Sequence, residues 1–341
     1  MANIHDVAKR AGVTIGTVSR AFNGYKDVSE NTKKRIFEAA RELQYSPQVI
    51  ARSLSSKISP RIGMIVSGFL DTNDKDSLLY LLEKGVYRYT LENDLEVSIF
   101  TTDFSRLKNK SYAQFCREHS IPGAILSGIT VDDIYLHELI DSDIPCVTID
   151  VPLEGKRLGC VTIDDRKAEA ELTDYLFANG HRDFIVIAGR KNATVTGSRM
   201  AGIRDACLGR GVPLKDEQVY YCDFDEKAAH DRVFAYLREP GGPKATAFIC
   251  HSDIMAIGAL RAIREAGYAS PGDFSVTGFD DIPLAVYMEP ALTTVAQNFT
   301  QKGYESAKLL RSIILDEPCV RNVVLPYEMR VRSSVRPPAG R

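Results

Sequence analysis

The chain has 341 residues, of which 44% are hydrophobic and 26% are charged, a composition typical of a soluble globular protein with two or three domains. No segment is apolar for long enough to cross a membrane or to form the core of a signal peptide, so we expect a cytoplasmic protein with no membrane partner. The seven cysteines are scattered and never form a CxxC pair, which excludes a disulfide framework and a zinc ribbon and indicates buried, reduced thiols.

The formal net charge of −2 conceals an uneven distribution of charge along the chain. Residues 1–60 contain ten Lys and Arg against five Asp and Glu, a net charge of +5, whereas the remainder contains 33 against 40, a net charge of −7. A basic N-terminal part attracts the phosphate backbone of DNA, and an acidic remainder keeps the protein in solution.

Residues 1–46 are predicted to form an all-α head with a helix-turn-helix motif. Two sets of apolar residues recur at the spacing of a single helix face, and they are Ile4, Val7, Ala8 and Ala11, then Val18, Ala21 and Phe22. Gly12 between them can adopt the left-handed conformation of the turn. Ser29 is placed to cap a third helix, which carries Lys33, Lys34 and Arg41 on its outer face.

The second helix presents a polar face close to its start, where a recognition helix meets base edges and phosphates. With the apolar face turned to the core, the residues that point outward are Ile15, Gly16, Thr17, Ser19 and Arg20. A helical bundle with ordinary solvated lysines is the simpler alternative, but the complete motif spacing favours DNA binding.

Residues 47–60 are predicted to form a hinge after the third helix. Pro47 ends that helix, and Ser, Lys and Pro residues lead to the next strand. Leu54 has two possible roles: a packing residue, which spacing alone favours, or an apolar wedge between minor-groove base steps where two hinges meet.

From residue 61 onward, short apolar strands alternate with helices in two similar series, the pattern of α/β lobes with parallel strands. The first series comprises IGMIVSG, a helix over 77–93, LEVSIF, a helix around 111–118, AILSGI, a helix around 132–141 and PCVTID. The second comprises a helix over 165–179, FIVIAG, a helix over 198–210, VYYCDF, a helix over 226–238, AFICHS, a helix over 253–266 and FSVTGFDD.

The C-terminal part indicates that the chain crosses between the lobes more than once, because TTVAQ, a helix over 300–315 and a strand over 320–332 follow the second series. We therefore divide the body, residues 61–341, into lobes of about 61–162 with 293–318 and of about 163–292 with 319–335. The tail VRPPAGR has no heptad pattern, so no C-terminal coiled coil is expected.

Polar and aromatic side chains follow several of the predicted strands. The carboxyl ends of such strands line the cleft between two α/β lobes, which is where small ligands bind. These side chains are Asp150, Arg199, Phe224, Ser252, Asp253, Asp280 and Asp281. Carboxylates, a guanidinium and an aromatic face together suit a polyol or a sugar. An Asp after a strand is also a common helix cap, which is the simpler interpretation of Asp253 and Asp281.

Neither an enzyme nor a metal site is expected. The sequence contains no GxSxG, HExxH, P-loop or GxGxxG signature, and the adjacent carboxylates of Asp280 and Asp281 would point to opposite sides of a strand. Asp71, Asp74 and Asp76 lack the glycine and the glutamate of a calcium loop, which indicates a solvated loop. No cofactor is expected. An exported sugar-binding protein would need a signal segment and no basic head.

Five segments spread over the chain carry a family resemblance, and they are DVAKRAGVTIGTVSRAFNG, VSENTKKRIFEAARELQYSPQVIARSL, GSRMAGI, SDIMAIGAL and GFDDIPLAVYMEPALTTV. By these segments the chain resembles the LacI/GalR (lactose repressor/galactose repressor) family of bacterial transcriptional regulators. The resemblance implies a periplasmic-binding-protein-like body and a homodimeric repressor on a palindromic operator. A small effector in the cleft would control DNA affinity, by induction or by corepression.

The resemblance also assigns residue roles. Ile15, Gly16 and Arg20 would read bases, and the residues expected at phosphates are Thr17, Ser19, Asn23 and Thr32. Leu54 becomes a minor-groove wedge. Arg199 and Asp280 are the first candidates for effector contacts, followed by Asp150, Phe224 and Ser252.

A sugar or sugar derivative is the expected effector. A purine is an alternative within the same fold, because Phe224 and Arg199 also suit a purine, and a sugar phosphate or acidic sugar is another, because Arg190 and Lys191 lie nearby in sequence. The chain departs from the family pattern at Gln48, where Asn is usual, in the loop GFLDTNDKDS, and at Ser252, where Asn or Gly is common. The last two departures bear on which effector is bound.

Overall fold

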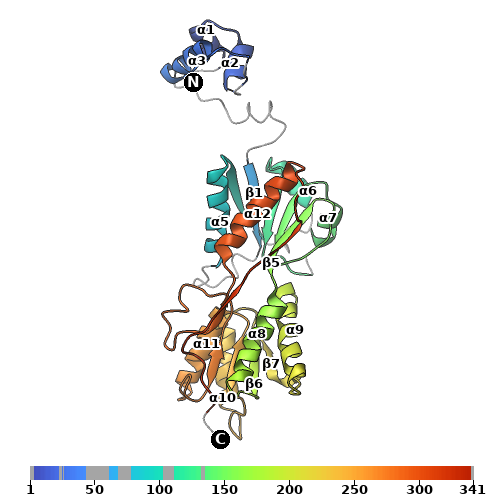
Figure 1. Cartoon of the computed structure of the whole chain (residues 1–341), viewed down its shortest axis with the longest axis vertical. Helices are drawn as coiled ribbons and strands as arrows, with labels where there is room; N and C mark the ends of the chain where they lie inside the picture. The colour runs from blue at the N-terminus through green and yellow to red at the C-terminus, as the bar shows by residue number, and fades with distance from the viewer. Residues whose placement is uncertain are drawn as a thin grey trace. The chain divides into compact units, whose positions relative to one another are not determined.

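The computed structural model describes residues 4–22, 25, 27–43, 61–67, 78–102, 111–131 and 135–338, and the chain divides into two compact units at residue 60 (Figure 1). Each unit is described by itself. The predicted hinge with Leu54 lies outside the described residues, as does the loop with Asp71, Asp74 and Asp76.

In its described residues, the N-terminal unit, called the head, is a small bundle of three helices, which confirms the helix-turn-helix prediction. They are α1 (Ile4–Ala11), α2 (Ile15–Phe22) and α3 (Glu30–Glu42). The side chains of Val7, Val18 and Ile36 have no exposed surface and form the centre of its core. Gly12 has a φ of +64° in the turn, and the Ser29 hydroxyl accepts a hydrogen bond from the Thr32 amide at the start of α3, as predicted for the cap.

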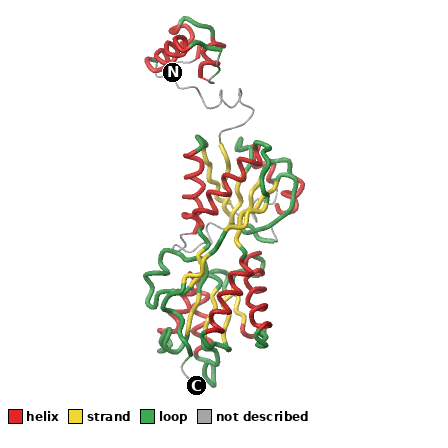
Figure 2. The backbone as a smooth tube through the Cα atoms, in the orientation of Figure 1, coloured by secondary structure: helices red, strands yellow, loops and turns green. Residues whose placement is uncertain are grey.

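The first lobe of the body is a six-stranded parallel sheet in the order β11-β5-β4-β3-β1-β2. Its strands are β1 (Arg61–Ser67), β2 (Glu96–Thr102), β3 (Ala124–Ser127), β4 (Cys146–Ile149), β5 (Leu158–Ile163) and β11 (Asn322–Leu325). Helices α5 (Leu78–Glu92) and α12 (Phe299–Ile314) cover one face, and α6 (Tyr112–Glu118) and α7 (Tyr135–Asp141) cover the other (Figure 2).

The second lobe is a four-stranded parallel sheet in the order β7-β6-β8-β9. Its strands are β6 (Phe184–Ala188), β7 (Val219–Tyr221), β8 (Ala247–Cys250) and β9 (Ser275–Thr277), and a short 3₁₀ helix spans Asp216–Gln218. Helices α8 (Asp165–Ala178) and α9 (Thr194–Gly209) cover one face, and α10 (Glu226–Leu237) and α11 (Asp253–Glu265) cover the other.

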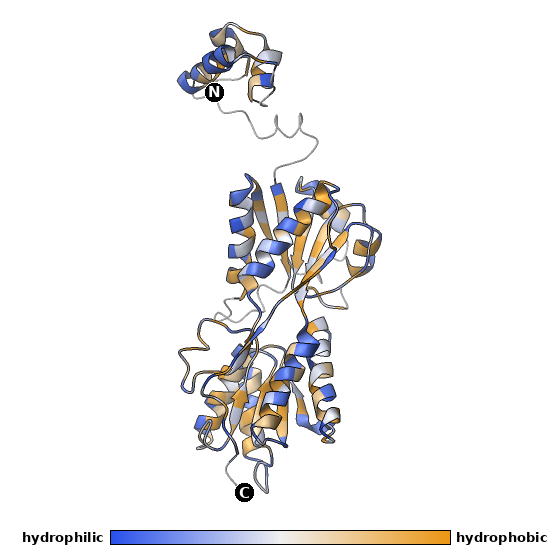
Figure 3. Ribbon diagram, in the orientation of Figure 1, coloured by the Kyte–Doolittle hydropathy of each residue, from blue (hydrophilic) through white to orange (hydrophobic). Residues whose placement is uncertain are grey.

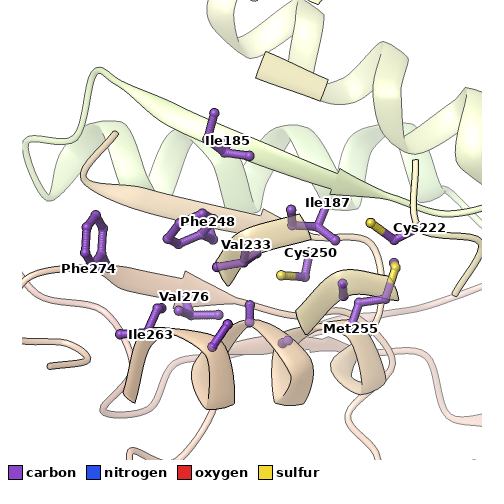
Figure 4. Close-up of a cluster of buried hydrophobic side chains, with 14 of the residues drawn as sticks. Ile185, Ile187, Cys222, Val233, Phe248, Cys250, Met255, Ile263, Phe274 and Val276 are labelled. Atoms are coloured by element: carbon purple, nitrogen blue, oxygen red, sulfur yellow. The ribbon is translucent and has the colours of Figure 1, made fainter. Parts of the chain in front are cut away.

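The central strands are continuously apolar because helices bury both faces of each sheet (Figure 3). Along β6, Phe184, Val186 and Ala188 pack toward α8 and α9, whereas Ile185 and Ile187 belong to the cluster under α10 and α11. Figure 4 shows this second cluster, with Ile185, Ile187 and Phe248 on the strands and Met255 and Ile263 on helix α11.

Between residues 135 and 338, which are described without a gap, the chain crosses from one lobe to the other three times. The crossings follow β5, β10 (Thr294–Ala296) and β11, and β10 pairs antiparallel with β12 (Glu328–Arg330). The predicted strand over 320–332 is therefore two strands, separated at Pro326, which lacks an N–H group for strand pairing. Its first part, β11, pairs with β5 in the first lobe, whereas the prediction placed residues 319–335 with the second lobe.

Strand β5 is absent from the prediction, because only eight residues and no helix separate LGCVTI from β4. Strand β7 is shorter than the predicted VYYCDF, since Asp223 and Phe224 have φ values of +54° and +64°, which end the extended conformation. All seven cysteines are free, and six of them are buried. None of the described helices is long and apolar enough to cross a bilayer.

Candidate DNA-binding surface and ligand cavity

The predicted DNA-reading residues of the head lie on the outer face of α2. Ile15, Gly16 and Arg20 are exposed, and Thr17 and Ser19 are partly exposed. Ile15 leaves 41% of its surface exposed although it is apolar, whereas Val18 on the same helix has none exposed. An exposed isoleucine beside Gly16 suits apolar contact with a thymine methyl group.

Arg20 makes a weak contact with Asp27. Its guanidinium lies 3.2 Å from Asp27, and both side chains are more than half exposed. Such an exposed pair contributes at most about 1 kcal/mol, so DNA can take over the guanidinium at little cost. Partly exposed Thr32 is anchored by Ser29, whose hydroxyl lies 2.8 Å from its own. The predicted contacts Asn23 and Leu54 lie outside the described residues.

The five residues predicted to contact an effector come from separate parts of the sequence and line one cavity of the body. They are Asp150, Arg199, Phe224, Ser252 and Asp280. The cavity has a volume of about 280 Å³, which suits a small ligand. Ser67, Ser127 and Gly128 from the ends of β1 and β3 line it from the first lobe, so it lies between the carboxyl ends of both sheets.

Three of these residues have left-handed backbone conformations, with φ values of +58° at Asp150, +64° at Phe224 and +111° at Asp280. Such conformations are uncommon for residues with side chains and gather at functional sites. The Phe224 ring packs on the backbone of Gly189, where a Cβ atom would lie 2.1 Å from the ring. The glycine that ends FIVIAG is thus required by the position of this aromatic wall.

Arg199 is the central cation of the cavity, and its side chain is 3% exposed. Its Nε donates to Asp165 at 2.8 Å, one terminal nitrogen donates to the carbonyl of His251, and the other lies 3.8 Å from Asp280. Burial disfavours its charge, but the carboxylates of Asp165 and Asp280 outweigh burial and raise the pKa of Arg199. The guanidinium is therefore a permanently charged, rigid donor.

A chain of charge-assisted hydrogen bonds joins carboxylates of the two lobes. The amide of Gln297 donates to Asp280 at 2.5 Å, and its oxygen accepts from the ammonium of Lys302, also at 2.5 Å. Lys302 in turn donates to the two carboxylate oxygens of Asp150 at 2.7 and 2.8 Å. Asp150 follows β4 of the first lobe and Asp280 follows β9 of the second, so this chain spans the junction between them.

Two of the predicted roles near α11 need correction. The cap of α11 is Ser252, whose hydroxyl accepts from the Met255 amide, and Ser252 also lines the cavity. The capping interpretation of Asp253 is wrong, because its buried carboxylate accepts from the Thr294 hydroxyl at 2.6 Å and from the Ile282 amide at 2.8 Å.

Asp253 fastens β10 and the loop after β9 to α11, and burial, followed by the charge of Asp280, raises its pKa well above the ordinary value. Asp281 pairs with Arg332 at 2.6 Å, which ties the same loop to the chain after β12 instead of capping a helix.

Buried polar groups lie behind Arg199. Both carboxyl oxygens of Glu169 and both ring nitrogens of His251 have no hydrogen-bond partner in the described part of the chain. Burial is the main cause that raises the pKa of Glu169 to about 8, and burial followed by Arg199 lowers the pKa of His251 well below its usual value. Both groups are therefore uncharged at neutral pH, and the carboxylates of Asp165 and Asp280 balance the positive charge of Arg199.

Sequence reasoning missed Asp165, Gln297 and Lys302. Asp165 opens α8 and resembles any acidic residue in a first helical turn. Gln297 and Lys302 lie at the start of α12, in the segment QNFTQKG, where a polar residue normally faces solvent. The predicted crossover between the lobes could have indicated them, because it brings this segment to the junction of the lobes.

Both parts of the chain match known family models. Residues 3–48 match "Bacterial regulatory proteins, lacI family", and residues 173–335 match "Periplasmic binding protein-like domain". The probable HTH-type transcriptional repressor ExuR of Bacillus subtilis is 30% identical over 98% of this chain and 99% of its own length. The HTH-type transcriptional repressor PurR of Aliivibrio fischeri is 29% identical over 98% of each chain.

Solved structures agree with these matches. A cellobiose complex of the transcriptional regulator CelR superposes with a TM-score of 0.73 at 27% identity, over 98% of this chain and 100% of that one. The lac repressor dimer bound to operator and the anti-inducer ONPF superposes with a TM-score of 0.84 at 23% identity, over 98% of each chain, and shows a shared fold.

Proposed function

The chain belongs to the lacI family of bacterial transcriptional regulators, and from this premise we propose that it is a repressor that binds a palindromic operator as a homodimer, with an affinity controlled by a small sugar-like effector. The observation that carries the proposal is the convergence of five side chains from both lobes on one cavity. An effector that binds the closed and open arrangements of the lobes unequally would shift the geometry of the dimer and hence its DNA affinity. Such a protein acts in the cytoplasm, where the DNA is.

The lining supports a hydroxyl-rich ligand. Asp150 and Asp280 offer acceptors, Arg199 offers donors, and the Phe224 ring offers an apolar face of the kind that packs against a sugar ring. The same carboxylates are already tied to cations, so we infer that the cavity binds its ligand without transforming it. A purine stacked on Phe224 is the second candidate.

Homodimerisation has support on the surface of the first lobe. Tyr80, Tyr87 and Leu91 lie along one side of α5 and leave 64%, 62% and 68% of their surfaces exposed. Ile99 on the edge strand β2 lines a shallow groove together with Tyr80 and Tyr87. Apolar side chains gathered in this way favour contact with another protein surface, and a second copy of the chain is the partner that the proposal requires.

The DNA half is tested with an operator selected from random DNA by the purified protein. Arg20→Ala should weaken binding to this operator by about ten- to a hundredfold, since one base-reading guanidinium is worth about 1–3 kcal/mol. Arg10→Ala is the control, because Arg10 belongs to α1 and pairs with Glu42 of α3 at 2.7 Å. Equal operator affinity of the Arg20 variant and the native protein would remove the assigned role.

The ligand half is tested by a thermal-shift screen with sugars, sugar acids, sugar phosphates and purines. A ligand that binds only the folded protein raises the midpoint of unfolding by mass action, and it should also change operator affinity. Asp280→Asn should abolish the shift, whereas Asp205→Asn, which removes an exposed partner of Arg166, should retain it. A compound that shifts the midpoint but leaves operator binding unchanged would favour a binding protein without a regulatory role.

A further inference from the structure

Lys302 is a fully buried lysine whose hydrogen-bonding capacity is already filled. Its side chain has no exposed surface, and its three ammonium protons face three acceptors, two on Asp150 and one on Gln297. The ammonium also lies 5.0 Å from the centre of the Phe299 ring. A lysine is rarely buried to this extent unless it is paired, because desolvation of an isolated ammonium is very unfavourable.

The arrangement places Asp150 between this cation and the cavity. Asp150 lines the cavity, with 16% of its side chain exposed, whereas Lys302 does not. An incoming ligand therefore meets carboxylate oxygens whose negative charge is balanced from behind. These oxygens can still accept hydrogen bonds from hydroxyl groups through their remaining lone pairs.

The other buried cation at the cavity is balanced in the same way. Arg199 faces Asp165 and Asp280. Within the described body, the two buried cations beside the cavity, Arg199 and Lys302, are therefore each paired with a carboxylate. Arg190 and Asp223 add one charge of each sign to the lining. An anionic ligand would meet the carboxylates of Asp150 and Asp280 without an unopposed buried cation to compensate.

We propose that the Lys302–Asp150 pair sets the charge specificity of the cavity: Lys302 balances and orients Asp150 from behind, so the wall offers hydrogen-bond acceptors to uncharged, hydroxyl-rich ligands and offers no unopposed cation to phosphates and carboxylates. This inference rests on the proposed function only in taking the cavity as the effector site. Its corollary is that Asp150 screens Lys302 from anions, so removal of the Asp150 charge should create an anion site.

Inorganic phosphate is the probe, and the full-length protein is compared in four forms: the native protein, Asp150→Asn, Lys302→Met and the double variant. Binding is measured by calorimetry and by thermal shift at constant ionic strength. Asp150→Asn should bind phosphate at least about tenfold more tightly than the native protein, equal to about 1.4 kcal/mol, and the double variant should lose this gain. Asp150→Asn keeps an oxygen that can accept from Lys302, so it should fold.

Two controls separate this effect from general salt stabilisation. Asp223→Asn removes an exposed charge that is not paired with Lys302, so it should gain much less phosphate affinity than Asp150→Asn. Glucuronate should also gain affinity in Asp150→Asn relative to glucose. The proposal is overturned if the native protein binds phosphate as tightly as Asp150→Asn, or if the double variant keeps the gain.

Failure of the proposed function would look different. If no cavity ligand changed operator affinity, regulation by this site would be wrong, while the phosphate measurements on the four forms would stand unchanged. The two outcomes are therefore distinguishable.

Discussion

The carboxyl group of Glu169 is held in the second lobe without exposure to solvent and without a hydrogen-bond partner in the described part of the chain. Burial raises its pKa from an ordinary value of 4.5 to about 8. Between these pH values the unfolded chain loses the proton and the folded chain retains it. Its contribution to stability is therefore fully present below about pH 4.5 and is lost as the pH rises to about 8.

Glu169→Gln removes this titration and keeps the shape of the side chain. The free energy of unfolding of the variant, relative to the native protein, should rise between pH 5 and pH 8 by up to about 4 kcal/mol, because each pKa unit corresponds to about 1.4 kcal/mol. Urea denaturation at a series of pH values measures the difference. A stability difference that does not change with pH would mean that Glu169 is not protonated in the folded protein.

At the scale of elements, three helix pairs approach so closely that a glycine is needed at each contact. A Cβ atom at Gly85 in α5 would lie 1.9 Å from the backbone of α12, one at Gly202 in α9 would lie 2.2 Å from that of α8, and one at Gly258 in α11 would lie 2.2 Å from that of α10. In the sequence these glycines only lower the helix propensity of the predicted helices. The close packing of the helix pairs explains why they are present.

Gly202→Ala should therefore destabilise the body by about 1–3 kcal/mol, since the added methyl group forces α8 and α9 apart. Gly197→Ala on the same helix is the matched control, because nothing lies within 4 Å of its Cβ position. That substitution should be neutral or stabilising by up to about 1 kcal/mol. Equal effects of the two substitutions in chemical denaturation would contradict close packing at Gly202.

The elements themselves were largely predictable, because periodicity and caps are local. The three head helices and the alternating strands and helices of the body follow the predicted order. The exceptions are β5 and the division of residues 320–332 into β11 and β12, where the assignment depends on pairing with a strand distant in sequence. No helix separates β5 from β4 or β12 from β11, so the local sequence does not indicate which sheet each strand joins.

At the scale of the whole molecule, we propose the exposed apolar side of α5 as the surface where two copies meet. Tyr87→Asp should shift the protein from dimer to monomer and weaken operator binding, because a charge would have to be buried in the interface. Leu208→Asp is the control, since Leu208 is 75% exposed on α9 of the second lobe. Analytical ultracentrifugation over a concentration series measures the mass. A Tyr87→Asp protein that remains a dimer would place the interface elsewhere.

The candidate cavity was predictable in part. Residues at the ends of parallel strands meet at one edge of a sheet, so Asp150, Phe224, Ser252 and Asp280 could be named from the strand pattern alone. Arg199 was found because it follows β6 within the next helix. The supporting groups could not be found, since their partners are set by the crossovers and not by neighbouring sequence.

The sequence by itself determined the helix-turn-helix head, the two α/β lobes and the polar residues at the strand ends, because each depends on the spacing of side chains along a few turns or strands. Only the tertiary structure decided how the charges pair. Lys302 and Asp150 are separated by 152 positions, and the chain reaches α12 only after passing through the second lobe and returning. Burial then makes their pairing necessary, because an ammonium removed from water is strongly destabilising unless it is paired with an opposite charge.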